Sequence, residues 1–227
     1  MLGDRPTGPP PSLPAVPGEL TAEQRYLFDT LGYLQIPDVL GAAELEECRA
    51  AVRDYVATPD DAMPAGFERA PGGEWLHAFA WAPALERLCM HSKLWPIVLE
   101  LTDGKPKMAA SSGTLWHEDT AAAAAGANDA AATSGAHGVR LHCARESTGW
   151  ETSAAIFDAK NGRIQVGHAL VFIYLEGIAA GEGGLLVVPG SHKSNFERVD
   201  SAHGVYGGRQ VAIGETVILL TLCLHRH

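Results

Sequence analysis

The sequence contains few cysteines, and they are not arranged in any recognised motif. The 227 residues include four cysteines, at Cys48, Cys89, Cys143 and Cys223, far apart and without a CxxC pair. This spacing fits neither a disulfide framework nor a zinc knuckle. We therefore expect reduced thiols and a cytoplasmic location.

Positive charge is also scarce. Lysine and arginine total 17 against 27 acidic residues, for a formal net charge of −10 and no basic cluster. Because nucleic-acid binding depends largely on neutralising phosphates, this balance argues against nucleic acid and anionic membranes as partners. No apolar run reaches the roughly 18 residues that span a bilayer, so no membrane span is expected. A glycine-rich nucleotide loop and a nucleophile elbow are likewise missing.

The composition fits one globular domain. Apolar residues make up 46% of the chain and charged residues 19%, which supplies enough apolar side chains for a sizeable core. Residues 1–19 are rich in proline and are expected to form a disordered lead. Residues 20–227 are expected to form a single domain, since one core can extend to about this size.

The N-terminal part of the domain has the pattern helix, strand, helix. Thr21 and Gln24 form a possible capping box for a helix that runs to Leu31 and ends at Gly32. A short strand, 33–36, follows and is stopped by proline. Apolar residues then recur at helical spacing at Leu45, Cys48, Val52 and Tyr55, and a further helix is expected from Pro83 to Met90 and on past Pro96.

From Met108 onward, short β-type runs alternate with turn residues. The clearest are Gly113–His117, Val139–Cys143, Arg163–Leu175, Gly184–Val188 and Glu215–Leu224. Helices followed by many strands predict a mainly β fold with flanking helices, a jelly-roll with helices outside one sheet. Residues 120–138 are rich in small residues and are expected to be an insertion loop.

The segment His117-Glu118-Asp119 matches the strand-borne half of an iron(II) site. Non-haem iron oxygenases bind their metal through two histidines and one carboxylate. Because side chains alternate along a strand, His117 and Asp119 would share one face. A surface turn of the same composition would look the same.

Three segments carry a resemblance to a known family. They are the run Gly181–Lys193, with its Gly-Gly-Leu-Leu-Val-Val-Pro-Gly-Ser-His-Lys core, together with Phe28–Leu40 and Gly214–Ile218. The sequence resembles the phytanoyl-CoA dioxygenase family of iron(II)- and 2-oxoglutarate-dependent oxygenases. The resemblance implies a cupin-like double-stranded β-helix, Fe(II) and 2-oxoglutarate as cofactors, and hydroxylation of a small or lipid-like substrate. His192, in the turn motif, is not normally an iron ligand there and is expected to have a structural or supporting role.

The resemblance also implies metal ligands. His225 matches the distal iron-binding histidine, because it ends the apolar strand that follows Gly214 and shares strand parity with Val217, Leu219, Thr221 and Cys223. His142 suits the first histidine by its spacing to the Pro-Gly-Ser-His motif, but Ala144 stands where the family has aspartate.

Three possibilities for the missing carboxylate remain open. Glu146 supplies it if the chain turns back after Ala144. Alternatively, Asp119 or His117 completes the site from a neighbouring strand. In the third possibility no carboxylate binds, and the alanine leaves room for a halide on the iron, as in halogenating relatives.

The far carboxylate of 2-oxoglutarate requires a cation, for which the planar guanidinium of arginine is suited. The family places this arginine beyond the distal histidine, whereas the present sequence ends at His227. Arg145, Arg163 and Arg209 are the candidates to replace it. We also expect the final strands of the jelly-roll to be lacking, which would leave Glu215–Leu224 as an exposed sheet edge.

Two other functions fit the same pattern. A jelly-roll that has lost its metal would act as a binding module or be inactive. A cupin-type zinc hydrolase would bind a metal without 2-oxoglutarate. The oligomeric state is not indicated by the sequence.

Overall fold

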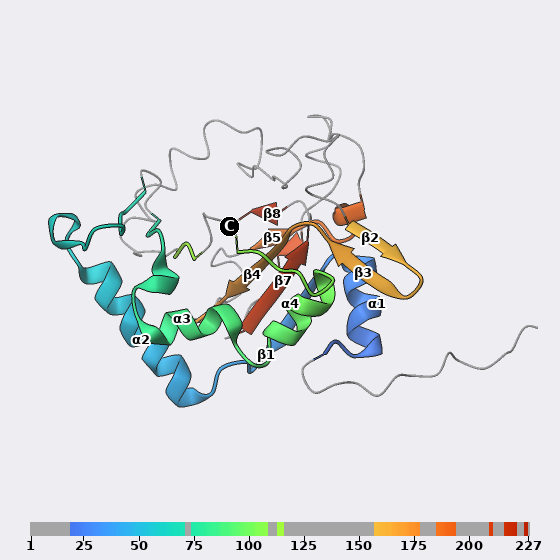
Figure 1. Ribbon diagram of the computed structural model, residues 1–227, viewed down its shortest axis with the longest axis horizontal. Coiled ribbons are helices and arrows are strands. Elements are labelled where there is room, and N and C mark those ends of the chain that lie inside the picture. Colours follow the sequence, from blue (N-terminus) through green and yellow to red (C-terminus); the bar gives the residue numbers. More distant parts are fainter. Residues whose placement is uncertain are drawn as a thin grey trace, which may run out of the picture.

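The computed structural model describes residues 19–70, 74–108, 113–115, 157–177 and 185–193, together with the backbone of short strands at 209–210, 216–221 and 225–226. The helices of the first hundred residues lie around a small antiparallel sheet (Figure 1). The helices are α1 (Ala22–Leu31), α2 (Ala42–Ala57), α3 (Pro83–Glu86) and α4 (Trp95–Leu101), with 3₁₀ turns η1 (Asp60–Ala62), η2 (Ala78–Ala80), η3 (Arg87–Met90) and η6 (Ser191–Lys193).

The strands are short and form two three-stranded sheets and one hairpin. They are β1 (Tyr33–Pro37), β2 (Phe157–Lys160), β3 (Arg163–Val166), β4 (Ala169–Ile173), β5 (Leu186–Val187), β6 (Arg209–Gln210), β7 (Thr216–Thr221) and β8 (His225–Arg226). The first sheet has the order β1-β7-β4 and the second β6-β5-β8, while β2 and β3 pair as a hairpin. The hairpin turns at Asn161 and Gly162, which both have positive φ angles, as tight hairpin turns require.

Helix α1 has the capping box predicted from its sequence. The Thr21 hydroxyl accepts a hydrogen bond from the Gln24 amide at 3.1 Å, and the Gln24 side chain accepts one from the Thr21 amide at 2.9 Å. At the other end, Gly32 adopts φ 80° and donates its N–H to the Phe28 carbonyl. Glycine adopts this left-handed conformation without the strain that a β-carbon would bring. The predicted helix and its two ends are therefore confirmed.

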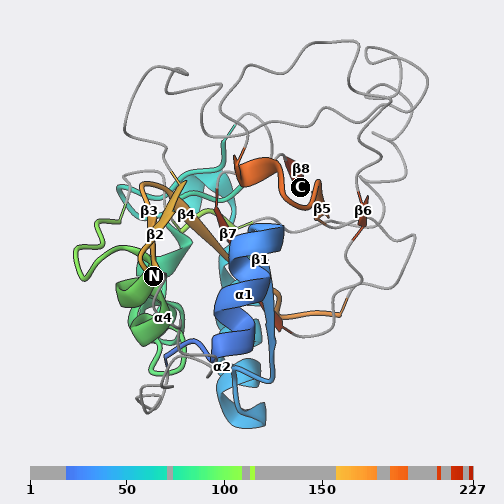
Figure 2. The ribbon, with the colours of Figure 1, turned by 90° about the vertical axis from the view of Figure 1, so that its right-hand side faces the viewer.

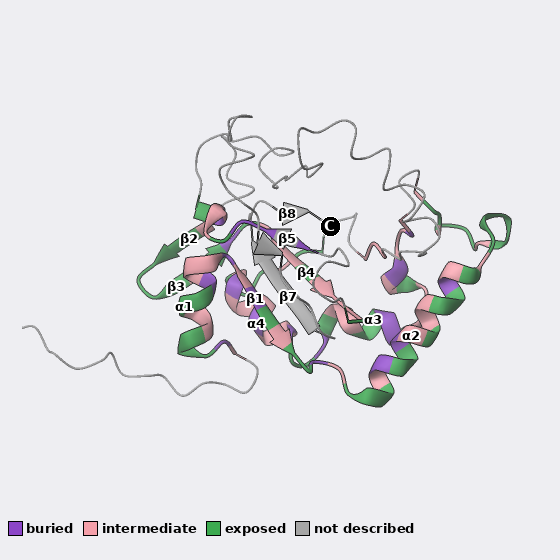
Figure 3. Ribbon diagram, turned by 180° about the vertical axis from the view of Figure 1, so that it is seen from behind, coloured by how far each residue is buried: buried purple, intermediate pink, exposed green. Residues whose placement is uncertain are grey.

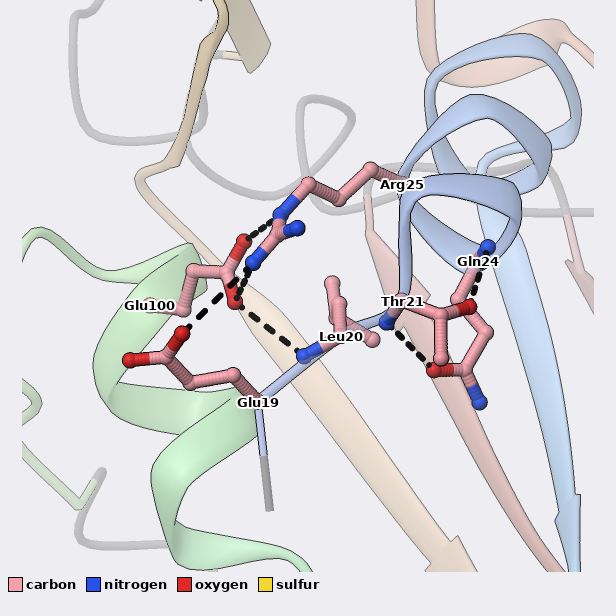
Figure 4. A network of polar contacts seen from close by, with 6 residues as sticks. All are labelled: Glu19, Leu20, Thr21, Gln24, Arg25 and Glu100. Carbon is pink, nitrogen blue, oxygen red and sulfur yellow. Dashed lines mark hydrogen bonds and ion pairs between the residues drawn. The ribbon is translucent and has the colours of Figure 1, made fainter. Parts of the chain in front are cut away.

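An ionic contact joins the start of α1 to α4 (Figure 4). The Arg25 guanidinium donates to both carboxylate oxygens of Glu100, at 2.5 and 3.0 Å. The same carboxylate accepts the backbone N–H of Leu20 at 3.2 Å, and Glu19 lies 3.8 Å from Arg25. Because Leu20 is fully buried, its amide depends on Glu100 for a partner.

Strand β7 lies in the middle of the first sheet. It pairs antiparallel with β1, with Tyr33 opposite Leu220, and with β4, with Leu170 opposite Leu220. The expectation that this apolar run would be an exposed edge is therefore wrong. The reason is non-local: β1, from near the start of the chain, occupies one side of the strand, and β4 occupies the other.

One face of the first sheet is covered by helices. Leu34 and Ile36 of β1 pack against α1 and α4, in a core cluster that includes Phe28, Ile97 and Leu101. The opposite face turns towards the second sheet, as Figure 2 shows. There Leu185 and Val187 are fully buried against Tyr33, Leu170, Phe172 and Tyr174. Two facing sheets with helices outside one of them is the arrangement expected of a jelly-roll.

A second helical cluster lies around α2. Its buried residues Leu45, Cys48 and Tyr55 follow the predicted helical spacing, and the opposite side of the helix is exposed (Figure 3). Tyr55 stacks on Trp81 with ring centroids 4.2 Å apart, and Phe67 packs edge-on against both rings. This aromatic cluster fixes the α2 layer beside α3.

Several predicted elements are shorter than expected. The predicted helix Pro83–Met90 with its extension is divided into α3, η3 and α4, because the backbone is extended at His91 and Pro96 fits only the first turn of α4. The predicted strand Arg163–Leu175 is divided into β3 and β4. The run Gly184–Val188 contributes a two-residue strand, and of Gly113–His117 the described part contains one bridge, between Leu115 and Trp75.

Other predicted segments lie outside the described residues. They include the strand Val139–Cys143, the insertion loop 120–138 and residues 1–18 of the predicted lead. Glu19, the last residue of that lead, is described and contacts Arg25. Among the helices that the structure describes, none is long and apolar enough to cross a bilayer.

Candidate metal and cosubstrate site

The predicted site residues fall into two groups. His117, Asp119, His142, Arg145 and Glu146 lie outside the described residues. His225 and Arg209 lie on strands of described backbone, β8 and β6. Within the described ranges, no group of three or more histidine, cysteine, aspartate or glutamate residues is arranged to hold a metal ion.

Strand β5 brings His225 and Arg209 into one row. In the antiparallel ladders, Val187 lies opposite His225 on one side and opposite Arg209 on the other. Neighbouring strands are about 4.8 Å apart, so the Cα atoms of these two residues are separated by roughly 10 Å. Residues directly opposite each other belong to the same face of a sheet.

Val187 itself faces the first sheet. It is fully buried, in a cluster with Leu185 that packs against Leu170 and Phe172 of β4 and against Tyr174, the residue after Ile173. His225 and Arg209 are therefore the two ladder partners of a residue buried between the sheets.

This placement differs from the one inferred by strand parity. The sequence pattern treats Val217 to His225 as one strand with a common face. In the structure β7 ends at Thr221 and belongs to the first sheet, whereas His225 begins β8 in the second sheet. Val217 and Leu219 lie opposite Ile36 and Leu34 of β1, the two residues that pack against the helices. The parity argument therefore joins residues of two different sheets, and the role of His225 as a metal ligand stays a prediction.

The third candidate arginine lies elsewhere. Arg163 is exposed at the start of β3, opposite Lys160 on the hairpin. Its ladder partner is a cation, and neither strand of this hairpin belongs to the sheet of His225. Of the arginines proposed to bind the cosubstrate, only Arg209 shares that sheet within the described part of the chain.

Tyr174 contributes a hydroxyl to the largely apolar space between the sheets. Burial raises the pKa of Tyr174 to about 12, an effect partly offset by a hydrogen bond with the backbone of Leu185. The phenol therefore remains protonated at neutral pH. Its neighbours Phe172 and Leu185 are apolar, so the space suits a group that must be kept from bulk water.

The Pro189–Lys193 corner follows β5 and contacts the C-terminal end of α1. Gly190, at φ 80°, donates its N–H to the Leu31 carbonyl at 2.8 Å. Nε2 of His192 lies 2.9 Å from the Asp29 carbonyl, and Lys193 forms an ion pair with the Asp29 carboxylate at 3.3 Å. The structural role expected for His192 is thus seen as a specific contact, which the sequence pattern alone did not identify.

His192 is almost fully buried, with an exposed fraction of 1%. Its ring packs edge-on against Phe157, with centroids 4.5 Å apart. Burial lowers the pKa of His192, and the contact with the Asp29 carbonyl opposes this only in part. The imidazole is therefore neutral at pH 7, and the contact with a carbonyl requires the proton on Nε2.

Comparison with known proteins identifies the family and the fold. The model of the family described as phytanoyl-CoA dioxygenase matches residues 28–207, more than half of the chain. No curated protein matches the sequence.

Several solved structures share the fold. HygX from Streptomyces hygroscopicus, crystallised with nickel and 2-oxoglutarate, matches with a TM-score of 0.62 and 22% identity over 91% of this chain and 79% of HygX. EctD from S. alaskensis, crystallised with 2-oxoglutarate and 5-hydroxyectoine, matches with a TM-score of 0.57 and 17% identity over 95% of this chain and 71% of EctD. AviO1 from Streptomyces viridochromogenes matches with a TM-score of 0.53 and 14% identity over 90% of this chain and 85% of AviO1.

At these identities the structural likeness establishes the fold, and the family match establishes the relationship. The predicted resemblance is confirmed, and the chain belongs to the phytanoyl-CoA dioxygenase family.

Proposed function

We propose that this protein is an Fe(II)- and 2-oxoglutarate-dependent dioxygenase that hydroxylates a small or lipid-like molecule. The observation that supports the proposal is the pair of ladders in which the fully buried Val187 lies opposite both Arg209 and His225. We infer from it that a candidate metal ligand and a candidate cosubstrate cation lie on the two strands that flank β5, on the face that turns towards the first sheet. Family membership supplies the reaction class.

The chain's own residues suit such a centre. His142 and His225 would provide the two imidazoles, and Glu146 the carboxylate, with His117 and Asp119 as the alternatives. Bound Fe(II) would supply oxygen activation coupled to the oxidative decarboxylation of 2-oxoglutarate, with the protein providing binding and orientation. A structure of HygX contains iron, and others of HygX and EctD contain 2-oxoglutarate, which supports these two cofactors.

The cosubstrate would be oriented by an arginine. Arg209 is the preferred partner for its far carboxylate, since a guanidinium side chain is long enough to cover much of the roughly 10 Å between the positions of Arg209 and His225. Arg145 is the alternative.

The wall opposite would be formed by the first sheet. Leu170 and Phe172 exclude water from the space that Val187 faces, and the protonated Tyr174 offers a hydroxyl that donates a hydrogen bond. In such a dry environment each polar contact to a bound carboxylate is stronger than in water. A double-stranded β-helix, with insertion loop 120–138 at its mouth, is the architecture we propose around this wall.

The substrate is proposed to be a small molecule. HygX has been crystallised with hygromycin B and EctD with 5-hydroxyectoine, both far smaller than a protein. The net charge of −10 argues against nucleic acid as a partner. The free thiols of Cys48 and Cys89 are compatible with a reducing cytoplasm, which is the proposed location.

Anaerobic binding of Fe(II) and 2-oxoglutarate tests the proposal. The visible charge-transfer band of a chelated iron–2-oxoglutarate complex should appear with the wild-type protein and disappear in His142→Ala and His225→Ala. His91→Gln is the matched control. His91 follows η3, contacts Glu44 of α2 and lies outside the proposed site. If the wild-type protein binds no iron, a binding module without metal is the better description. Metal binding without 2-oxoglutarate would instead indicate a hydrolase.

A further inference from the structure

The C-terminal end of α1 is capped by residues far away in the sequence. The last carbonyl groups of a helix have no partner within the helix and must be satisfied elsewhere. Here the Phe28 carbonyl accepts from Gly32, the Asp29 carbonyl contacts His192, and the Leu31 carbonyl accepts from Gly190. Figure 2 shows the orange Pro189–Lys193 corner beside this end of α1. Two of the three described contacts therefore come from the corner.

This cap is connected to His225 along two routes. On one side, the corner follows directly after Val187, which pairs with His225. On the other side, α1 leads through Gly32 into β1, and β1 pairs with β7, which ends four residues before His225. The contact between Nε2 of His192 and the Asp29 carbonyl joins the corner after β5 to the end of α1, where these two routes meet.

We propose that His192 is a positioning residue for the metal site: its Nε2–H, held on the Asp29 carbonyl, fixes the end of β5 and thereby the place of His225. This inference rests on the proposed function, since His225 is taken as the metal ligand. His192 acts through β5 and does not touch the metal.

The surroundings of His192 allow only one such contact. In the part of the chain that the structure describes, Nδ1 is buried without a hydrogen-bond partner. The ring edge meets Phe157, and the charged groups nearest to it are Asp29 on α1 and Lys193 beside it. A substitute must therefore donate from the position of Nε2, while a donor at the position of Nδ1 has nothing to bind.

This geometry defines a pair of matched variants. The side-chain nitrogen of glutamine reaches the position of Nε2, whereas that of asparagine reaches the position of Nδ1. His192→Gln should retain the cap and keep the Fe(II) dissociation constant within about threefold of wild type. His192→Asn should lose the cap and weaken Fe(II) binding about tenfold or more, the range found when groups that orient metal ligands are removed.

A destabilised control separates positioning from stability. Thr21→Ala removes the cap at the opposite end of the same helix and should lower the melting temperature without changing the Fe(II) dissociation constant. If Thr21→Ala weakens metal binding as much as His192→Asn, or if His192→Asn binds as tightly as wild type, the inference is wrong. A wild-type protein that binds no Fe(II) would instead overturn the proposed function, and the inference with it.

Gly190→Ala provides a second variant should His192→Asn fail to fold. Its φ of 80° strains any residue with a β-carbon, although the nearest atom to that carbon, the Thr30 carbonyl oxygen, is 3.6 Å away. The change loosens the same corner without altering His192. We expect a severalfold loss of Fe(II) affinity, and unchanged affinity would count against the inference.

Discussion

Val187 and His225 lie directly opposite each other in the antiparallel ladder between β5 and β8. Val187 is fully buried. The apolar sequence around it predicts a strand but does not show that this strand pairs with the last residues of the chain. The pairing explains how a short strand before the Pro-Gly-Ser-His motif can influence a residue 38 positions later.

Truncation of Val187 should be costly. Val187→Ala removes two buried methyl groups and leaves a cavity between the sheets, which we expect to lower the free energy of unfolding by about 2 kcal/mol. Val171→Ala is the control, since Val171 is 40% exposed on β4 and should lose less than about 1 kcal/mol. Denaturant unfolding measures both. Equal losses would show that the space between the sheets is not tightly packed.

Arg209→Gln should selectively weaken 2-oxoglutarate binding. A hydrogen bond to a charged group contributes about 1.5–3 kcal/mol, so its loss corresponds to an increase of roughly ten- to a hundredfold in the dissociation constant. Calorimetric titration of 2-oxoglutarate into the anaerobic iron-loaded protein provides the measurement. Arg163→Gln, on the exposed hairpin, should bind the cosubstrate as wild type does. If Arg209→Gln also binds 2-oxoglutarate as tightly as wild type, Arg209 is not the cosubstrate cation, and Arg145 becomes the next candidate to test.

Acid should weaken the fold through His192. Burial lowers the pKa of this imidazole in the folded protein below its ordinary value of 6.5, while the unfolded chain titrates near that value. The unfolded state therefore binds more protons below pH 6.5, so the stability contributed by neutral His192 is complete above that pH and is lost as the pH falls towards the folded-state pKa.

The non-titrating His192→Gln variant isolates this effect from the other histidines. The difference in unfolding free energy between wild type and His192→Gln should be constant above about pH 7 and should decrease progressively below about pH 6.5. Denaturant titrations across this range measure it. A difference that increases on acidification would mean that the folded-state pKa is raised instead.

Gly113 lies where a side chain has no room. Its φ is 81°, and an added β-carbon would overlap the ring of Phe79. Gly104 has a similar φ of 71° with nothing within 4 Å, so Gly104→Ala should cost only the backbone strain of about 1 kcal/mol. Gly113→Ala should cost roughly 2 kcal/mol more because Phe79 must move. Thermal unfolding of both variants tests this, and equal losses would refute the steric contribution.

Local features of the fold were predictable from the sequence, but strand pairing was not. The Thr21 capping box and the Gly32 stop depend on residues a few positions apart, and both were confirmed. The position of β7 depends on β1, whose Tyr33 pairs with Leu220 of β7, 187 residues later, and no short-range pattern contains that information.

The same distinction applies to the site. Motif resemblance identified the family and pointed to His225, whereas Arg209 was one of three arginines considered as replacements for the family's arginine. Strand alternation assigned His225 a face through a strand that ends at Thr221. The row through Val187 requires the registers of two ladders, which a pattern of apolar residues cannot supply. The roles of His225 and Arg209, like those of His142 and Glu146, remain predictions.

The central position of β7 has a consequence for how the protein is made. During synthesis β1 and β4 leave the ribosome well before residues 216–221. Until β7 is made, both strands lack the partner that lies between them in the folded sheet. Pairing across such long sequence separations is slow, because the chain must close a large loop first. In the nascent chain the open edges of β1 and β4 are sites where another chain can pair. We therefore expect aggregation to be more frequent for the incomplete nascent chain than for the folded protein, in which β7 pairs with both strands.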